Sequence, residues 1–514
     1  ELDFVDSHHY GDHPRNWRLF HQGSSTESSA LVPRLLFPDR IFGKPFTVTE
    51  INYTFPNRWR AESAPLLGSY AALQDWDALY RFAWGHSRNA VLKKEAIIRF
   101  DTIQDPIARF AEKIIVLMFR RGDVSSATTA LAYPFGERDF EGIAKYDKNT
   151  SKFPSAFEKL GFYCRVGALP AEKKLPGILT LPQGNWRSGI PDPIRKQLAI
   201  NTDTRPVTSE NGEITLDACH SAMRTVTPRT ECLMLKSGDS SGRVMRISGA
   251  DTFMVVSASA MDGKNLADSG KILLFHLTNA LNNKMRFANE TMTEVLSWGN
   301  PNDLLLKRGK CTVQLHLNGP EREVVALHFD GTEKQVLPSV TNKGVLEFTA
   351  DTGAGVMAYL IRPAKQGRTL PLSTTFEPDS YLNDNMVLQR DTPIFIAGTQ
   401  GEPGKIVQVA FAGSEYRALV DPAGNWKTVL PAQKAGGPYE LLISGKEKKV
   451  IYRNILCGDV WLCAGQSNME YGMYKVADSK NEVAQAKYSE IRLAKVPTER
   501  SSDTVFTQLA DRLV

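Results

Sequence analysis

The hydrophobic pattern of the first part of the chain alternates between strand-like and helical stretches. Residues 41–50 form a short apolar, β-branched run that predicts a buried strand. Residues 64–77 carry apolar side chains at spacings of three and four, which predicts an amphipathic helix. A short strand at 79–84 and a second helix at 105–120 follow the same rules. This order is typical of a parallel α/β sheet or barrel, and we predict that class for residues 1–145.

The rest of the chain has a different pattern of hydrophobic and polar residues. Residues 146–199 are rich in lysine and proline without a clear period, and we predict an insertion or connecting segment. Short β segments separated by turns fill residues 200–363 and again 364–454, which predicts two β-sandwich domains. Residues 455–514 open with an apolar strand at 455–463, and the pattern after it is again typical of alternating strands and helices.

Composition narrows the class of protein. A chain of 514 residues that is 42% hydrophobic is long enough for three or more domains, each with its own core. The net charge is only +5 and no basic run occurs, which argues against a nucleic-acid partner. No apolar run approaches the roughly 20 residues of a membrane-spanning helix.

The six cysteines are too sparse for a disulfide scaffold, and none forms a Cys-x-x-Cys pair. Cys219 and Cys232 flank a possible hairpin and are close enough in sequence to pair. We expect buried thiols instead.

A candidate nucleophile lies near the C-terminal end, where residues 457–469 read CGDVWLCAGQSNM. In α/β hydrolases a strand that ends in Gly-x-Ser exposes the serine hydroxyl, and the backbone N–H groups that follow bind an oxyanion. Ser467 fits this pattern, although Gln466, Ser467 and Asn468 also suit a simple helix cap. Trp461 in the same stretch is expected to pack in the core. A superficially similar SGDSSG at 237–242 lies between two β runs and is predicted to be a hairpin tip.

The C-terminal motif resembles the start of the hydrolase domain in the sialate O-acetylesterase family, through the words GDVWL and GQSNM. Upstream, LNDNMVLQR at 382–390 and PIFIAG at 393–398 resemble the β-sandwich that precedes that domain. The resemblance implies that an SGNH-type α/β/α domain starts at residue 455. In it Ser467 would be the nucleophile of a Ser-His-Asp ester hydrolase, with Gln466 and Asn468 at the substrate. No histidine follows Ser467 in this sequence, so the general base that a serine nucleophile needs is not assigned.

A second candidate site lies at the predicted ends of the N-terminal strands. Glu50 closes the strand at 41–50, the residues VDSHHY at 5–10 close another, and Trp84 closes the strand at 79–84. Catalytic groups of (β/α)₈ barrels lie at the C-terminal ends of the strands, and a tryptophan there can stack on a sugar. The alternatives are a helix-entry carboxylate for Glu50 and a loop cluster or metal site for the histidines.

These residues resemble the last three β/α units of a clan A glycoside hydrolase barrel. The resemblance implies a partial (β/α)₈ barrel that performs retaining hydrolysis with Glu50 as nucleophile, Tyr10 as its hydrogen-bond donor, and His8 and Trp84 at the sugar. Such a reaction needs a second carboxylic acid, which the resemblance assigns to an earlier strand outside this sequence. Glu62 is a rival nucleophile of lower rank because it lies in or before a helix rather than at a strand end.

We therefore expect an internal piece of a bifunctional carbohydrate-active hydrolase, a retaining glycosidase joined to a carbohydrate O-acetylesterase. The predicted partner is an acetylated oligo- or polysaccharide, the predicted location is secreted or periplasmic, and no metal or other cofactor is expected. Neither a nucleic-acid partner nor a membrane span is expected, and the sequence leaves the oligomeric state open.

Two other classes remain open at this point. One is a carbohydrate-binding or surface structural protein with inactive catalytic remnants, in which Trp298, Trp426 and Tyr416 serve as stacking platforms. The other is a metal enzyme that uses the histidines His8, His9 and His13.

Overall fold

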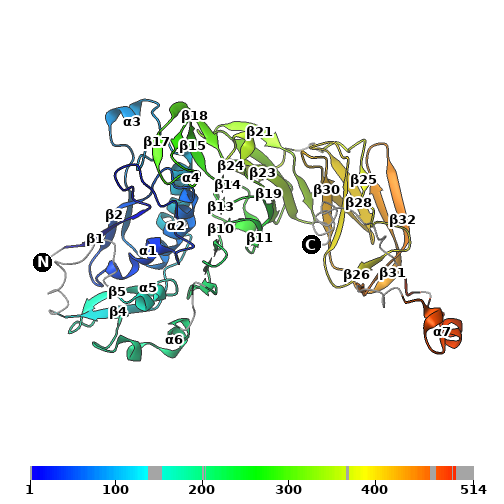
Figure 1. Cartoon of the computed structure of the whole chain (residues 1–514), viewed down its shortest axis with the longest axis horizontal. Helices are drawn as coiled ribbons and strands as arrows, with labels where there is room; N and C mark the ends of the chain where they lie inside the picture. The colour runs from blue at the N-terminus through cyan, green and yellow to red at the C-terminus, as the bar shows by residue number, and fades with distance from the viewer. Residues whose placement is uncertain are drawn as a thin grey trace. The chain divides into compact units, whose positions relative to one another are not determined.

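A computed structural model describes residues 3–136, 153–198, 202, 204–365, 370–463, 471–488 and 490–493. The chain divides into two compact units, Glu1–Thr369 and Leu370–Val514. β-Strands dominate both units and helices are few (Figure 1). The described residues therefore form a multidomain, mostly β structure, and they contain no closed eight-stranded barrel.

The first unit begins with three parallel strands in the spatial order β1 (Val5–Gly11), β2 (Phe46–Tyr53), β3 (Ala78–Arg81). The connecting helical segments are α1 (Leu31–Arg34), η1 (Phe37–Asp39), η2 (Arg60–Glu62), α2 (Ser63–Leu73), α3 (Arg88–Leu92), α4 (Pro106–Ile115) and η3 (Val116–Arg120). Strands and helices alternate as the sequence pattern predicts. The larger barrel to which these strands would belong stays a prediction.

The two main helices of this region differ in detail from the sequence prediction. Every residue of α2 is buried, so the expectation of an amphipathic helix is wrong. α2 packs beside α4 (Figure 1) and also against the β-sandwich, where the Ser69 and Thr225 hydroxyls lie 2.7 Å apart. α4 has an apolar face, and Asp105 caps it by accepting a hydrogen bond of 3.0 Å from the Ile107 N–H.

A second parallel sheet lies in the segment that the sequence pattern left without an assignment. It has the order β5 (Arg165–Pro170), β4 (Ala130–Phe135), β6 (Leu179–Thr180), accompanied by α5 (Ser155–Leu160), η6 (Trp186–Gly189) and α6 (Asp192–Leu198). β5 and β6 come from the predicted insertion, whereas β4 precedes it. Four residues of β5 are buried in succession, so the strand shows no alternation from which the sequence could identify it.

Two antiparallel sheets form the β-sandwich of the first unit. The nine-stranded sheet has the order β21 (Glu333–Leu337), β20 (Arg322–Leu327), β24 (Ala358–Pro363), β14 (Ile272–Leu277), β13 (Met254–Ala260), β10 (Thr230–Leu235), β9 (Ala222–Val226), β8 (Ile214–Asp217), β7 (Val207–Thr208). The five-stranded sheet has the order β11 (Gly238–Ser241), β12 (Met245–Ala250), β19 (Lys310–His316), β23 (Val345–Asp351), β22 (Val340–Asn342). Short 3₁₀ turns occur at η7 (Leu266–Asp268) and η8 (Thr352–Ala354).

The nine-stranded sheet is covered on both faces. One face meets the five-stranded sheet, where the Phe348 and Tyr359 ring centroids lie 5.6 Å apart. The other face packs against α2 and α4 through residues such as Met223 and Phe275. Because both faces are covered, every residue of β10 and β13 is buried, including the polar Glu231, Ser257 and Ser259. The SGDSSG stretch is an edge strand, β11, paired with β12, so its prediction as a hairpin tip is wrong.

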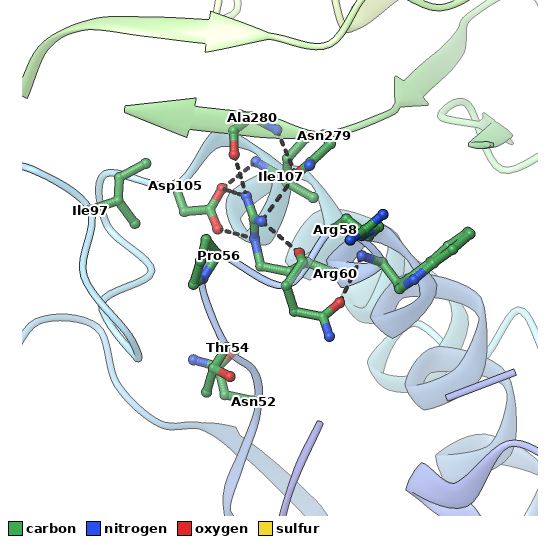
Figure 2. Close-up of polar contacts among 12 residues, drawn as sticks. Asn52, Thr54, Pro56, Arg58, Arg60, Ile97, Asp105, Ile107, Asn279 and Ala280 are labelled. Atoms are coloured by element: carbon green, nitrogen blue, oxygen red, sulfur yellow. Dashed lines mark hydrogen bonds and ion pairs between the residues drawn. The ribbon is translucent and has the colours of Figure 1, made fainter. Parts of the chain in front are cut away.

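One buried arginine joins the parallel-sheet region to the β-sandwich (Figure 2). The Arg60 guanidinium donates to both Asp105 carboxylate oxygens, at 2.7 and 3.2 Å. It also donates to the Asn279 side-chain oxygen at 3.0 Å and to the Ala280 and Asn57 carbonyls at 3.0 and 2.8 Å. Asn279 and Ala280 lie at the start of β15 (Ala280–Asn283), which pairs with β18 (Asn300–Leu306). Arg60 is only 1% exposed, so these contacts are shielded from water. We call the cluster of Arg60, Asp105, Asn279 and Ala280 the Arg60 joint.

The second short hairpin of this region consists of β16 (Arg286–Phe287) and β17 (Val295–Ser297). Trp298 follows β17 and packs on Phe20 and Phe55 of the parallel-sheet region, with centroid distances of 6.3 and 6.2 Å. The β16–β17 hairpin, which lies outside the two sandwich sheets, is therefore followed by a side chain that packs near the N-terminal strands.

The second unit is a smaller β-sandwich with its own core. One sheet has the order β25 (Glu377–Pro378), β27 (Ile394–Thr399), β30 (Trp426–Leu430). The other has the order β26 (Val387–Gln389), β32 (Lys449–Gly458), β31 (Gly436–Ser444), β28 (Ile406–Phe411), β29 (Ser414–Leu419). Beyond them lie η10 (Met473–Lys475) and α7 (Ser479–Gln485).

Two aromatic residues of this core were candidate sugar platforms. Trp426 and Tyr416 are 2% and 4% exposed, so neither presents a face to a ligand. The buried Trp426 indole donates a hydrogen bond of 3.2 Å to the Thr399 carbonyl. Both residues are therefore packing residues, and their assignment as stacking platforms is wrong.

The cysteines are all free thiols. Four of them, Cys164, Cys232, Cys311 and Cys457, are buried as expected. Cys219 and Cys463 are exposed, so the expectation of buried thiols does not extend to them.

Candidate active site

Glu50 and Tyr10 meet where the first two parallel strands lie side by side. In the register of the parallel pair His8 lies opposite Glu50 and Tyr10 opposite Asn52. The Tyr10 hydroxyl donates a hydrogen bond of 2.6 Å to Glu50 Oε2. Burial raises the pKa of Tyr10, and the hydrogen bond to Glu50 and its negative charge raise it further. The phenol therefore stays protonated and acts as a fixed donor to the carboxylate.

His8 links this carboxylate to a second one. Its Nδ1 lies 3.5 Å from Glu50 Oε2, and its Nε2 lies 2.9 Å from Asp6 Oδ2 and 3.0 Å from the Thr49 hydroxyl. Burial favours the neutral form of Asp6, but hydrogen bonds from Thr49 and Thr47 outweigh it, and the pKa of Asp6 is lowered. The imidazole is thus oriented between two carboxylates, and it is 46% exposed.

A cavity of about 550 Å³ opens beside Glu50. Its lining residues are Tyr10, His13, Trp17, Glu50, Phe82, His86, Ile98, Arg99 and Phe100. Tyr10 packs against Phe100 at a centroid distance of 5.0 Å and against Phe82 at 6.0 Å. The Glu50 side chain, 36% exposed, is the single carboxylate in this lining. An aromatic cavity with one oriented carboxylate suits a ring-shaped ligand that develops positive charge at the reacting atom.

The rim of the cavity is formed by a stack of side chains from distant parts of the chain. The Arg99 guanidinium carbon lies 5.2 Å from the Trp17 ring centroid and 5.7 Å from that of Trp298. Arg99 Nε donates a hydrogen bond of 3.1 Å to the Trp17 carbonyl. Trp17 is 57% exposed, so one aromatic surface remains open to solvent at the rim.

The other N-terminal candidates lie outside this cavity. Trp84 is 56% exposed but does not contribute to the lining, and β3 ends at Arg81 instead of continuing to Trp84 as predicted. Burial lowers the pKa of His9 to about 4, so His9 is uncharged at neutral pH. Residues 5–10, predicted to close a strand, lie within β1, which ends at Gly11. Glu50 likewise lies within β2, which continues to Tyr53, so the prediction that it closes its strand is wrong.

Glu62 is a structural carboxylate rather than a surface one. It is fully buried and accepts hydrogen bonds from the Ser24 hydroxyl at 2.5 Å and from the Ser25 and Thr26 N–H groups at 2.8 and 3.2 Å. Burial raises the pKa of Glu62 to about 7. Its hydrogen bonds hold the connection between β1 and β2, and it has no place in the cavity lining.

The C-terminal candidates Ser467, Gln466 and Asn468 lie outside the described residues. The strand predicted at 455–463 ends earlier, because β32 stops at Gly458. Trp461 is 83% exposed, which makes the expectation that it packs in the core wrong. The Val460 N–H is held by the Gln389 side chain at 2.8 Å, so the chain leaves the sandwich in a defined direction.

Neither a metal centre nor a membrane-spanning helix appears in the part of the chain that the structure describes. No group of three histidine, cysteine, aspartate or glutamate side chains in that part converges to hold an ion, and His8, His9 and His13 do not form one. Within the same residues no helix is long and apolar enough to cross a bilayer.

Comparison with known proteins relates part of the chain to esterases, while no family model matches it. It is 31% identical to the sialate O-acetylesterase of Pongo abelii over 136 residues, which is 24% of this chain and 26% of that protein. It is also 31% identical to the human sialate O-acetylesterase over 128 residues, which is 23% of this chain and 24% of that protein. The chain thus spans about a quarter of the length of these relatives.

One solved structure is also similar to part of the chain. A carbohydrate acetylesterase from Xanthomonas citri is 39% identical, with 23% of this chain and 26% of that chain covered and a TM-score of 0.20. From the curated relatives alone, about a quarter of the chain is similar to sialate O-acetylesterases, which are hydrolases.

Sequence reasoning found Glu50 and Tyr10 of the lining and His8 beside them, and it named His13 only as a possible metal ligand; it missed the rest of the lining. Phe82, His86, Arg99 and Phe100 all lie on β3 or the long connection that follows it. Their position after a parallel strand was the available signal, because such connections carry functional residues. No feature of the sequence pointed to Trp17.

Proposed function

We propose that this chain belongs to a carbohydrate-active hydrolase that removes O-acetyl groups from oligo- or polysaccharides, with Ser467 as its nucleophile. The supporting observation is the similarity of about a quarter of the chain to sialate O-acetylesterases. In this reaction the Ser467 hydroxyl attacks the ester carbonyl and the alcohol of the sugar leaves. Water then releases acetate from the acyl-enzyme. Backbone N–H groups after Ser467 stabilise the oxyanion, and Gln466 and Asn468 contact the substrate.

Acetate release from O-acetylated glycans by the protein purified from its native source tests this proposal. A Ser467→Ala variant should lose at least about 10³-fold in kcat, because the attacking hydroxyl is removed. Ser380→Ala, which changes an exposed serine of the second unit, is the matched control and should keep full activity. Equal activity of the two variants would eliminate Ser467 as the nucleophile.

We propose a second activity for the same protein, retaining hydrolysis of a glycosidic bond at Glu50. The supporting observation is the 2.6 Å hydrogen bond from Tyr10 to a carboxylate that faces an aromatic cavity. The Glu50 carboxylate attacks the anomeric carbon while a second carboxylic acid protonates the departing oxygen. Water then cleaves the glycosyl-enzyme ester. His8 is proposed to contact the sugar at Glu50, and Trp84, which lies outside the cavity lining, is proposed to contact the part of the glycan that extends beyond it.

The covalent intermediate provides a direct test of this second activity. A 2-deoxy-2-fluoro glycoside with a good leaving group should label Glu50, as mass spectrometry of the digested protein would reveal. Glu50→Gln should abolish both the labelling and the release of sugar, whereas Glu172→Gln, at an exposed site, should change neither. Labelling of another residue would rule out the assignment of Glu50.

The proposal also covers where the protein acts and the alternative class of protein that it excludes. We propose a secreted or periplasmic protein, where acetylated polysaccharides are accessible. If native protein binds these glycans but releases neither acetate nor sugar, the alternative of a carbohydrate-binding or surface structural protein holds instead.

A further inference from the structure

We propose that the cavity beside Glu50 selects a glycan that carries a negatively charged substituent, a uronate carboxylate or a sulfate ester, and that Arg99 is the residue that recognises it. This inference rests on the proposed glycosidase function, because it names the class of sugar that the same site accepts. It is argued from the contacts, the charge and the backbone of Arg99.

Arg99 presents a cation that the protein itself does not neutralise. Its Nε is used by the Trp17 carbonyl, whereas no carboxylate among the described residues lies within ion-pair distance of it. Glu50 lines the same cavity but forms its contacts with Tyr10 and His8 instead. The two terminal nitrogens of the Arg99 guanidinium therefore remain available as a pair of donors, the geometry that matches carboxylate and sulfate oxygens.

The guanidinium is held in place before any ligand arrives. It stacks on the rings of Trp17 and Trp298, which restricts its rotamers without using its terminal donors. The Arg99 carbonyl accepts a hydrogen bond of 2.8 Å from the Phe55 N–H, which anchors its backbone. A side chain fixed in this way loses little conformational freedom on binding.

The backbone around the stack is unusual for residues with side chains. Arg99 and Trp17 both adopt left-handed conformations, with φ of +48° and +61°. A non-glycine residue in this region is strained, and such residues concentrate at binding sites, where the surrounding structure maintains them. These two residues are the ones joined by the Nε hydrogen bond and the ring contact.

The remaining polar groups of the lining do not compete for this cation. The lining residue His86 is paired through Nδ1 with the Asp101 carboxylate, which lies 2.6 Å away and outside the lining. His13 Nδ1 contacts the Pro14 carbonyl at 3.2 Å. The open face of Trp17 beside Arg99 offers a stacking surface for a sugar ring while Arg99 binds the ring's anionic substituent.

Direct binding measurements test whether the cavity prefers acidic glycans. Three oligosaccharide probes of equal length, an oligogalacturonate, a sulfated oligogalactan and its unsulfated counterpart, are titrated into the native protein. Tryptophan fluorescence and calorimetry report binding, and the two acidic arms distinguish carboxylate from sulfate. We expect at least one acidic probe to bind ten-fold or more tightly than the neutral probe, with an affinity that falls as salt is added.

Two variants test whether Arg99 causes the tighter binding of acidic probes. Arg99→Gln should remove the preference for the acidic probe, whereas Arg99→Lys, which keeps the charge but not the paired donors, should retain part of it. Arg88→Gln, an exposed arginine on the same connection, is the matched control and should leave binding unchanged. Thermal unfolding checks that each variant is folded.

The outcomes separate this inference from the function on which it rests. Equal binding of acidic and neutral probes, or an unchanged preference in Arg99→Gln, overturns the selection even if Glu50 labelling succeeds. Arg99-dependent binding of an acidic probe without Glu50 labelling supports the selection and leaves the site as a binding site only. Absence of binding by all three probes overturns the inference outright.

Discussion

Single residues of the N-terminal strands acquire their chemistry from a partner across the sheet. Tyr10 and Glu50 are forty positions apart in the chain, yet parallel pairing brings the phenol within 2.6 Å of the carboxylate. The same contact keeps the Tyr10 hydroxyl protonated, because the negative charge of Glu50 adds to the effect of burial in raising the pKa of the phenol.

Removing this hydrogen bond should slow the proposed glycosidase without unfolding the protein. Tyr10→Phe keeps the aromatic packing against Phe82 and Phe100, and we expect kcat to fall by roughly 10- to 100-fold. Steady-state kinetics on an aryl glycoside measures this loss. An unchanged kcat would mean that Tyr10 does not support Glu50 during reaction.

A second residue-scale effect concerns a histidine in the core of the first unit. His276 on β14 is fully buried, and neither ring nitrogen has a hydrogen-bond partner among the described residues. Burial lowers the pKa of His276 to about 4 from an ordinary value of 6.5. The unfolded chain therefore takes up this proton first as the pH falls, and the folded state loses stability between about pH 6.5 and pH 4.

The pH dependence of stability should reveal this histidine. The shift corresponds to about 3 kcal/mol in the free energy of unfolding between neutral pH and pH 4, and His276→Leu should remove that contribution. Urea unfolding of both proteins at several pH values measures it. His316→Leu, at an exposed position on β19, is the control, and a wild-type to His276→Leu difference that does not vary with pH would contradict the expectation.

At the scale of elements, the first unit depends on contacts that join helices to sheets. α2 is buried on all sides because the parallel sheet, α4 and the nine-stranded sheet surround it. Arg60 holds the same regions together, since it binds Asp105 at the start of α4 and the backbone at the start of β15 (Figure 2).

Loss of the Arg60 joint should be strongly destabilising. Arg60→Met leaves the Asp105 carboxylate buried without its ion-pair partner, and we expect a loss of about 3–5 kcal/mol in the free energy of unfolding. Denaturant unfolding of the first unit measures the change. Arg109→Met, at an exposed position of α4, should cost less than about 0.5 kcal/mol, and comparable losses in the two variants would argue against a special role for the joint.

At the scale of the whole molecule, two compact units carry separate hydrophobic cores. The core of the second unit is contributed by both of its sheets and includes Trp426. Its residues pack with one another within Leu370–Val514, so the unit has the contacts that independent folding requires.

A fragment spanning residues 370–463 should therefore fold by itself. We expect one cooperative denaturant transition, followed by tryptophan fluorescence. Trp426→Ala should destabilise this fragment by about 3–5 kcal/mol or prevent folding, whereas Trp461→Ala, at an 83% exposed position, should have little effect. A gradual transition in the unmodified fragment would show that the unit needs the rest of the chain.

The sequence by itself determined the features that depend on local patterns. Alternating strands and helices, the helix predicted at 105–120 and most strands of the sandwiches follow from periodicity and turn residues. The GDVWL and GQSNM words predicted a resemblance to sialate O-acetylesterases, and about a quarter of the chain is similar to such proteins.

Only the tertiary structure decided which residues are buried and which meet. Trp426 and Trp461 are chemically identical side chains, yet packing of two sheets hides one and leaves the other exposed. Arg99, Trp17 and Trp298 come from three distant segments, and their stack forms because the residues after the β16–β17 hairpin pack against the N-terminal region. Periodicity reports which face of an element is apolar but not what covers that face, so these contacts were set by packing between elements far apart in the chain.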